Sequence, residues 1–157
     1  LRRALDHGVR AVVAHCGSMG QDRDLDQGEN GPYVDSFDLF ARLMDDPIYG
    51  PKLNGDISAM TQLNRAGPAL ETVLAREDWH PRLHNGSDYP LPGVMPLFSV
   101  TYMVQLGLIP QSAVPVLSEI RKHNPLLFDF VLKRHLSFKG RRFAKSVFET
   151  RQFFEKR

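Results

Sequence analysis

The chain has 157 residues, of which 42% are hydrophobic and 24% are charged, and its formal net charge is +2. This length supports one domain with one core, and the charge balance indicates no nucleic-acid or membrane partner. No window reaches the roughly 18 uninterrupted apolar residues of a membrane span, and no signal peptide is expected. The single cysteine, Cys16, excludes an internal disulfide and favours a location in the cytoplasm.

The predicted elements begin with a short amphipathic helix over residues 1–6, which ends at Gly8. A continuous, β-branched apolar run follows at Val9–Ala14 and predicts a strand that is buried on both faces. The polar, glycine-rich stretch Gly17–Gly31 predicts a long loop. Apolar residues at helical spacing then predict a helix over Ser36–Met44.

The middle of the chain continues the alternation of strand and helix. Leu53–Ala59 predicts a second strand, Pro68–Arg76 a helix that begins at a proline, and Arg82–Asn85 a third strand. Trp79, just before the third strand, is interpreted as a packing residue. Because helices separate all three predicted strands, we expect a parallel sheet in an α/β fold.

The last third of the chain is predicted to be helical. Met95–Leu106 is apolar enough for a buried helix, and a helix over Ser112–Ile120 is expected to have Ser112 as its N-cap. Asn124 is expected to cap a further helix, with Pro125 at its first position. The buried face of that helix is predicted to consist of Leu127, Phe128, Val131, Leu132 and His135.

Residues 138–157 are interpreted as a basic extension of the main unit, residues 1–137. Within this extension, Lys139–Arg157 carries interspersed phenylalanines and predicts a C-terminal helix. The apolar stripe favours docking of this helix on the outside of the domain or on a second subunit, rather than contact with nucleic acid or a membrane surface. A homo-oligomer is therefore left open.

Four motifs follow one another in the chain: H-C-G at 15–17, D-I-S at 56–58, G-S-D-Y-P at 86–90 and N-P-L-L-F at 124–128. Together they resemble the C-terminal part of the amidohydrolase superfamily, in its amidohydrolase-2 branch. The resemblance implies that the three predicted strands are strands six, seven and eight of a (β/α)8 TIM barrel, whose active site forms at the carboxyl ends of the strands. Three strands cannot close a barrel, so we expect the chain to be the C-terminal portion of a longer one.

The resemblance also implies a metal site. Asp88 corresponds to the strand-eight aspartate of the family, which binds the metal, accepts a proton from the metal-bound water, or does both. His15 corresponds to the strand-six histidine, either a ligand or a residue that positions water or polarises the substrate, and the second role is preferred here. The expected cofactor is zinc, with manganese, iron or cobalt as alternatives, because histidine and aspartate ligands accept all four.

Taken without the resemblance, the same residues leave plainer roles open. A histidine at a strand end is more often a hydrogen-bonded structural residue, and an aspartate before Tyr-Pro is more often a turn or cap residue. Asp56 and Ser58 either line the mouth of the pocket, or Asp56 caps a helix or pairs with a cation. His84 is interpreted as a satisfied core residue, and Cys16 as a small apolar residue that faces the helices.

The function that follows from the resemblance is metal-dependent hydrolysis of a C–N or C–O bond in a small-molecule substrate. A non-oxidative decarboxylase of the aminocarboxymuconate semialdehyde decarboxylase type, in which the same water protonates a carbon, is the alternative enzyme. The family's strand-one His-x-His pair and its strand-five histidine have no counterpart in this chain. An inactive fragment that lacks these upstream ligands is therefore the third alternative.

Overall fold

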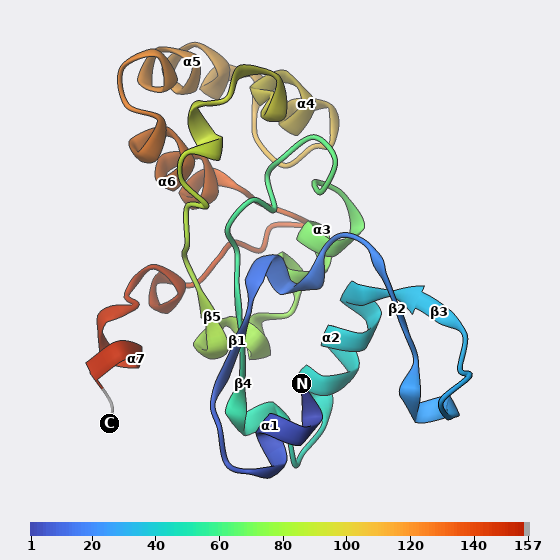
Figure 1. The fold of residues 1–157 in the computed structure, drawn as a ribbon. Helices are drawn as coiled ribbons and strands as arrows, with labels where there is room; N and C mark the ends of the chain where they lie inside the picture. Colours follow the sequence, from blue (N-terminus) through green and yellow to red (C-terminus); the bar gives the residue numbers. More distant parts are fainter. Residues whose placement is uncertain (156–157) are drawn as a thin grey trace.

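The computed structural model describes residues 1–155 and has a three-stranded parallel sheet at its centre (Figure 1). The strands are β1 (Ala11–Val13), β4 (Leu53–Asp56) and β5 (Leu83–His84), in the order β1-β4-β5. In β4, Gly55 is in register with Val13 of β1 and with Leu83 of β5. The predicted α/β fold with a parallel sheet is therefore confirmed, and within the described residues this sheet does not close into a barrel.

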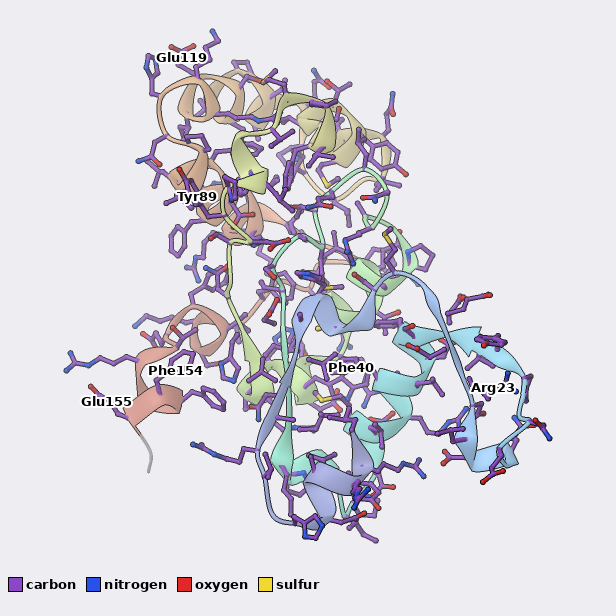
Figure 2. All side chains as sticks on the ribbon, in the orientation of Figure 1. Arg23, Phe40, Tyr89, Glu119, Phe154 and Glu155 are labelled. Carbon is purple, nitrogen blue, oxygen red and sulfur yellow. The ribbon has the colours of Figure 1, made fainter. Side chains whose placement is uncertain are left out.

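Three helices accompany the strands: α1 (Arg2–Asp6), α2 (Ser36–Asp45) and α3 (Pro68–Ala75). The buried residues of α2 recur at helical spacing, which places one apolar face against the sheet; they are Phe40, Leu43 and Met44. In Figure 2, Phe40 points inward from α2, and it is only 3% exposed. The boundaries predicted for these helices agree with the structure to within one residue.

The stretch predicted as a long loop, Gly17–Gly31, contains the first strand of an antiparallel ribbon, and the second strand follows shortly after it. The strands β2 (Gln21–Arg23) and β3 (Tyr33–Asp35) pair with each other and not with the parallel sheet. The ribbon is fastened to α2 because Arg42 donates to both carboxylate oxygens of Asp24, at 2.9 and 3.0 Å. Strand β2 is polar and exposed, and β3 has only the half-buried Val34 between two exposed residues, so no run of apolar alternation marks the ribbon in the sequence.

The helices α4 (Val100–Gln105), α5 (Val114–His123) and α6 (Pro125–His135) gather beyond the carboxyl ends of the strands (Figure 1). The single buried helix predicted over Met95–Leu106 is wrong, because a 3-10 turn precedes a shorter α4. The Ser99 side chain accepts a hydrogen bond from the Tyr102 amide at 3.1 Å, and this cap sets where α4 begins.

The capping prediction is wrong for α5 and confirmed for α6. Ser112 lies in a 3-10 turn, and α5 begins after Ala113. Asn124 does cap α6, since its Oδ1 accepts from the Leu127 amide at 2.9 Å. The predicted buried face of α6 is only partly correct, because Leu127 and His135 are exposed. The residues that α6 buries are Phe128, Asp129, Leu132 and Lys133.

The predicted C-terminal helix over Lys139–Arg157 is also wrong in the part that can be compared, and residues 156–157 lie outside the described residues. A turn with positive φ at Lys139 begins the segment, and a 3-10 helix and the short α7 (Arg151–Glu155) follow. The segment is tied to the edge of the sheet, where Val147 accepts a hydrogen bond from the Asn85 amide at 2.8 Å. Along residues 1–155, none of the helices has the length and apolar character that crossing a bilayer requires.

The ion pair of Asp45 is expected to make the stability of the protein depend on pH. Arg76 forms an ion pair with this carboxylate and Trp79 Nε1 donates to it at 2.9 Å, and the Arg76 hydrogen bond is the main reason that the pKa of Asp45 is lowered. A lowered folded-state pKa stabilises the protein above the ordinary pKa of about 4, and the contribution is lost as the pH falls through the folded value.

We therefore expect Asp45→Asn to destabilise the protein near neutral pH by less than about 1 kcal/mol, because the pair is half-exposed. The difference from the wild type should shrink as the pH is lowered from about 7 to about 2. Urea unfolding followed by circular dichroism across that range measures both. A difference in stability that grows towards low pH would contradict a lowered pKa of Asp45 in the folded protein.

Candidate functional site

The parallel sheet brings the two predicted site residues together. His15 lies in the turn after β1, and Asp88 lies in the turn after β5. Because the three strands run in the same direction, both turns lie at the carboxyl end of the sheet. His15 Nε2 is 3.7 Å from Asp88 Oδ2. The side chains are 22% and 34% exposed, so solvent or a small molecule has access to both.

Hydrogen bonds determine which nitrogen of His15 carries the proton. Nδ1 lies 3.2 Å from the carbonyl oxygen of Ser58 and 2.8 Å from its hydroxyl oxygen. A carbonyl oxygen can only accept, so in the neutral ring Nδ1 is the donor and Nε2 has the free lone pair. The Ser58 hydroxyl donates in turn to Asp56. This arrangement points an acceptor atom, Nε2, at Asp88.

Asp56, at the end of β4, links the turn after β1 to the turn after β4. Its Oδ1 accepts hydrogen bonds from the His15 amide at 3.1 Å, from the Ser58 amide at 2.9 Å and from the Ser58 hydroxyl. From the sequence, two roles were open for Asp56: it lines the mouth of the pocket, or it caps a helix or pairs with a cation. In the structure its carboxylate positions His15 through the backbone and through Ser58.

Backbone strain is concentrated in these turns. Five residues other than glycine have positive φ in residues 1–155, and four of them are His15, Cys16, Ala59 and Asp88, with φ between 52° and 55°. The fifth, Lys139, lies in the C-terminal segment. A side chain makes this conformation unfavourable, by about 1–2 kcal/mol for each residue. Such strain is typical of functional sites, where the surrounding structure holds residues in rare conformations.

Two titratable groups, Cys16 and His84, are buried next to this site. Cys16 is fully buried and donates to the Asp56 carbonyl oxygen at 3.2 Å, and burial raises the pKa of its thiol far above the ordinary range. A thiol held neutral is a poor nucleophile. His84 is buried, with Nε2 3.0 Å from Asn54 Oδ1, and burial lowers its pKa. Both residues are buried, as interpreted from the sequence. The interpretation of His84 as a satisfied residue is only partly correct, because its Nδ1 has no hydrogen-bond partner among the described residues.

The sequence interpretation missed Lys133 and Asp129 of α6. Each side chain is 1% exposed, and Lys133 Nζ donates to Asp129 Oδ2 and to the Gly86 carbonyl oxygen, both at 2.7 Å. The available signal was a charged i,i+4 pair on a helix that is otherwise apolar on that side. On most helices such a pair lies in solvent, so the sequence pattern alone does not mark it as part of a site.

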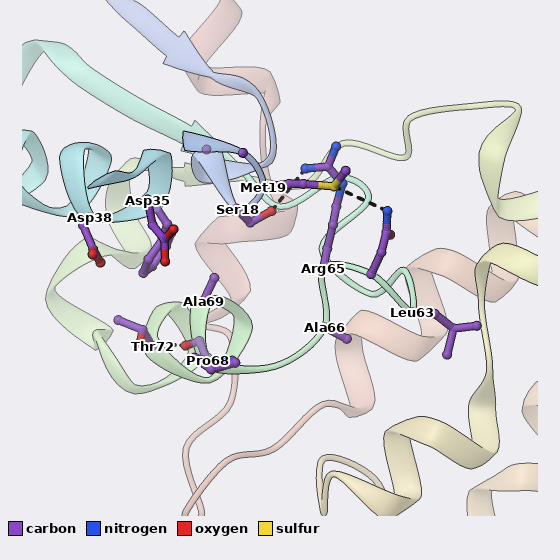
Figure 3. A pocket seen from close by; sticks show the side chains of 14 residues that line it. Ser18, Met19, Asp35, Asp38, Leu63, Arg65, Ala66, Pro68, Ala69 and Thr72 are labelled. Carbon is purple, nitrogen blue, oxygen red and sulfur yellow. Dashed lines mark hydrogen bonds between the residues drawn. The ribbon is translucent and has the colours of Figure 1, made fainter. Parts of the chain in front are cut away.

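A cavity of about 470 Å³ adjoins the loop that follows His15. Gly17, Ser18 and Arg65 are among the residues that line it, and Asp35 and Asp38 lie across it from Arg65 (Figure 3). Its volume is that of a small-molecule pocket. Neither His15 nor Asp88 lines it, so the cavity is a neighbour of the site and not the site itself.

The described residues fit one side of a metal site. Histidine nitrogen and carboxylate oxygen suit zinc, manganese, iron and cobalt, and the Nδ1 hydrogen bonds of His15 are those that a metal-ligating histidine makes. However, residues 1–155 contain no group of three or more histidine, cysteine, aspartate or glutamate side chains placed to hold one ion. Zinc sites in proteins use three or four protein ligands. His15 and Asp88 therefore need further ligands to hold a metal tightly.

Comparisons with protein-family models, with curated proteins and with solved structures gave no match to this chain. The resemblance to the amidohydrolase-2 branch remains a prediction based on the four motifs. The functional argument therefore depends on the geometry around His15 and Asp88.

Proposed function

We propose that His15 and Asp88 form one side of a hydrolase active site that cleaves a C–N or C–O bond in a small molecule with a metal-activated water. One observation carries the proposal: His15 Nε2 and Asp88 Oδ2 face each other at 3.7 Å, and both are acceptors when the ring is neutral. Two acceptors cannot bond to each other. A water molecule or a cation between them would satisfy both.

In this proposal Asp88 is the general base. Its carboxylate accepts a proton from the attacking water, and its exposure leaves room for that water. His15 orients the same water through Nε2, and Ser58 and Asp56 keep the lone pair of Nε2 directed at it. A divalent ion, zinc first and manganese, iron or cobalt as alternatives, would make water acidic enough to lose a proton at about pH 7. Asp88 would be one ligand of that ion and His15 would hold its water, while the other ligands would come from outside the described residues.

The metal-binding part of the proposal is tested with Mn²⁺ and two-dimensional ¹H–¹⁵N NMR of the full chain. We expect low-affinity binding that broadens the amide signals of Cys16, Gly86 and Asp88 before others, because a paramagnetic ion relaxes nearby nuclei. His15→Ala and Asp88→Asn should each weaken binding by at least roughly tenfold. Asp38→Asn removes an exposed carboxylate on α2 and should change nothing. Uniform broadening, or equal affinities in all variants, would refute the site.

The reaction is tested separately, by incubating the full chain and Zn²⁺ or Mn²⁺ with a panel of small amides, lactones and carboxylic acids. Hydrolysis that falls by roughly 10²- to 10⁴-fold in Asp88→Asn supports Asp88 as general base. Release of CO₂ without a hydrolysis product favours the decarboxylase. Selective Mn²⁺ binding without turnover of any compound favours the inactive alternative.

A further inference from the structure

The buried Lys133–Asp129 pair lies directly behind the turn that carries Asp88. Lys133 Nζ donates at 2.7 Å to the carbonyl oxygen of Gly86, which comes two residues before Asp88. The same Nζ donates at 2.7 Å to Asp129 Oδ2, one turn earlier on α6. Helix α6 is thereby linked to the carboxyl end of β5 through one ammonium group.

This pair is a poor choice for stability alone. Both side chains are 1% exposed, and Asp129 Oδ1 has no hydrogen-bond partner among the described residues. Burial lowers the pKa of Lys133 and raises that of Asp129, so each charge is disfavoured where it lies. Well-packed apolar residues often replace such a pair with equal or greater stability. Stability alone therefore does not account for the charged pair.

The position of Lys133 indicates that purpose. Besides Asp129, its charge interacts favourably with the carboxylates of Asp56 and Asp88. On the other side of the turn, a Cβ built on Gly86 would lie 3.2 Å from Ser58 Cβ, so the turn also packs closely against the residue that holds His15. Asp88 itself has a φ of 54°, a conformation that needs support from its surroundings.

We propose that Lys133 is a positioning residue, whose ammonium group holds the Gly86 carbonyl so that the Asp88 carboxylate faces His15 Nε2. Asp129 keeps Lys133 charged and aimed at the turn. The inference rests on the proposed function only for its chemical purpose, because the positioning of Asp88 can be observed without any metal or substrate.

Three variants of the full chain test this inference: Lys133→Met, the double variant Asp129→Leu/Lys133→Met, and Lys122→Met as a control. Lys122 is an exposed lysine of α5 that pairs with Glu119, so its variant makes the same substitution away from the site. Each protein is examined for its urea midpoint, for nuclear Overhauser contacts between the His15 ring and the Asp88 side chain, and for Mn²⁺ broadening.

We expect Lys133→Met to lower the urea midpoint, because Asp129 loses its partner, and the double variant to recover the wild-type midpoint or exceed it. Both variants should lose the contacts between His15 and Asp88 and bind Mn²⁺ at least tenfold more weakly, while Lys122→Met matches the wild type. If the double variant regains the urea midpoint but not the contacts between His15 and Asp88, the loss of those contacts is not a result of poor folding.

Two results would overturn the inference: contacts that persist in the double variant, or a double variant that is as unstable as Lys133→Met. A different pattern would reject only the proposed function. If the variants lose the contacts and the wild type shows no selective Mn²⁺ broadening, Lys133 positions Asp88 but the pair does not bind metal.

Discussion

Replacing Trp79 by alanine is expected to lower the free energy of unfolding by about 3–5 kcal/mol, the range for truncating a large buried aromatic residue. Trp79 is fully buried, and its ring lies edge-on to Phe40 with centroids 5.9 Å apart. Its Nε1 donates to Asp45, and the Arg76 guanidinium lies 4.1 Å from its ring centroid. The variant would leave a cavity between α2 and the sheet and remove a hydrogen bond.

Urea unfolding followed by far-ultraviolet circular dichroism measures this effect, since Trp79 is the only tryptophan and its fluorescence is lost in the variant. Trp79→Phe should be intermediate, because it keeps a ring and loses the donor. Tyr33→Ala removes a ring that is 61% exposed and should lower stability by less than about 1 kcal/mol. A similar small loss in Trp79→Ala would mean that this residue lies outside the core.

Replacing Gly55 by alanine is expected to destabilise the protein by about 1–3 kcal/mol, although it adds a single methyl group. Gly55 lies in the central strand β4. A Cβ there would lie 2.7 Å from Cys16 Sγ and 2.8 Å from Phe40 Cζ. Cys16 follows His15 in a strained turn, so the displacement would be transmitted to the site.

Urea unfolding tests this prediction, and the NMR signals of residues 15–17 report any shift of the turn. Gly93→Ala is the matched control: a Cβ there would make ordinary contacts, at 3.5 and 3.7 Å from Pro125. We expect a change within about 0.5 kcal/mol for that variant. Equal stabilities for the two alanine variants would show that β4 can move away from Cys16 and α2.

Much of the fold could be predicted because apolar runs and apolar residues at helical spacing mark its strands and helices. The expectation that the first strand is buried on both faces is wrong, however, since Val12 of β1 is 42% exposed. The runs at Val9–Ala14, Leu53–Ala59 and Arg82–Asn85 contain the three observed strands, and α2 and α3 lie where predicted. The predicted runs are longer than the strands. Hydrogen bonding to a neighbour defines a strand, whereas apolar character extends into the turns beyond it.

The errors occur where polar contacts or local capping decide the structure. The β2–β3 ribbon has no apolar alternation, and Arg42 fastens it to α2 from outside the ribbon. The C-terminal segment begins with the turn at Lys139 and continues through a 3-10 helix to the short α7, although its phenylalanines suggested one helix. The ion pair with Asp129 allows Lys133 to be buried, and a pattern of hydrophobic residues cannot reveal such a pair.

For the candidate site, the sequence alone placed His15 and Asp88 just beyond two of the strands and, from the parallel order, at the same end of the sheet. Only the tertiary structure decided which atoms face each other, because Ser58 and Asp56 orient His15 from another strand and Lys133 holds the Asp88 turn from α6. These contacts join residues that are distant in the chain. Local sequence patterns record the apolar faces of strands and helices, but not which polar groups meet in the folded chain.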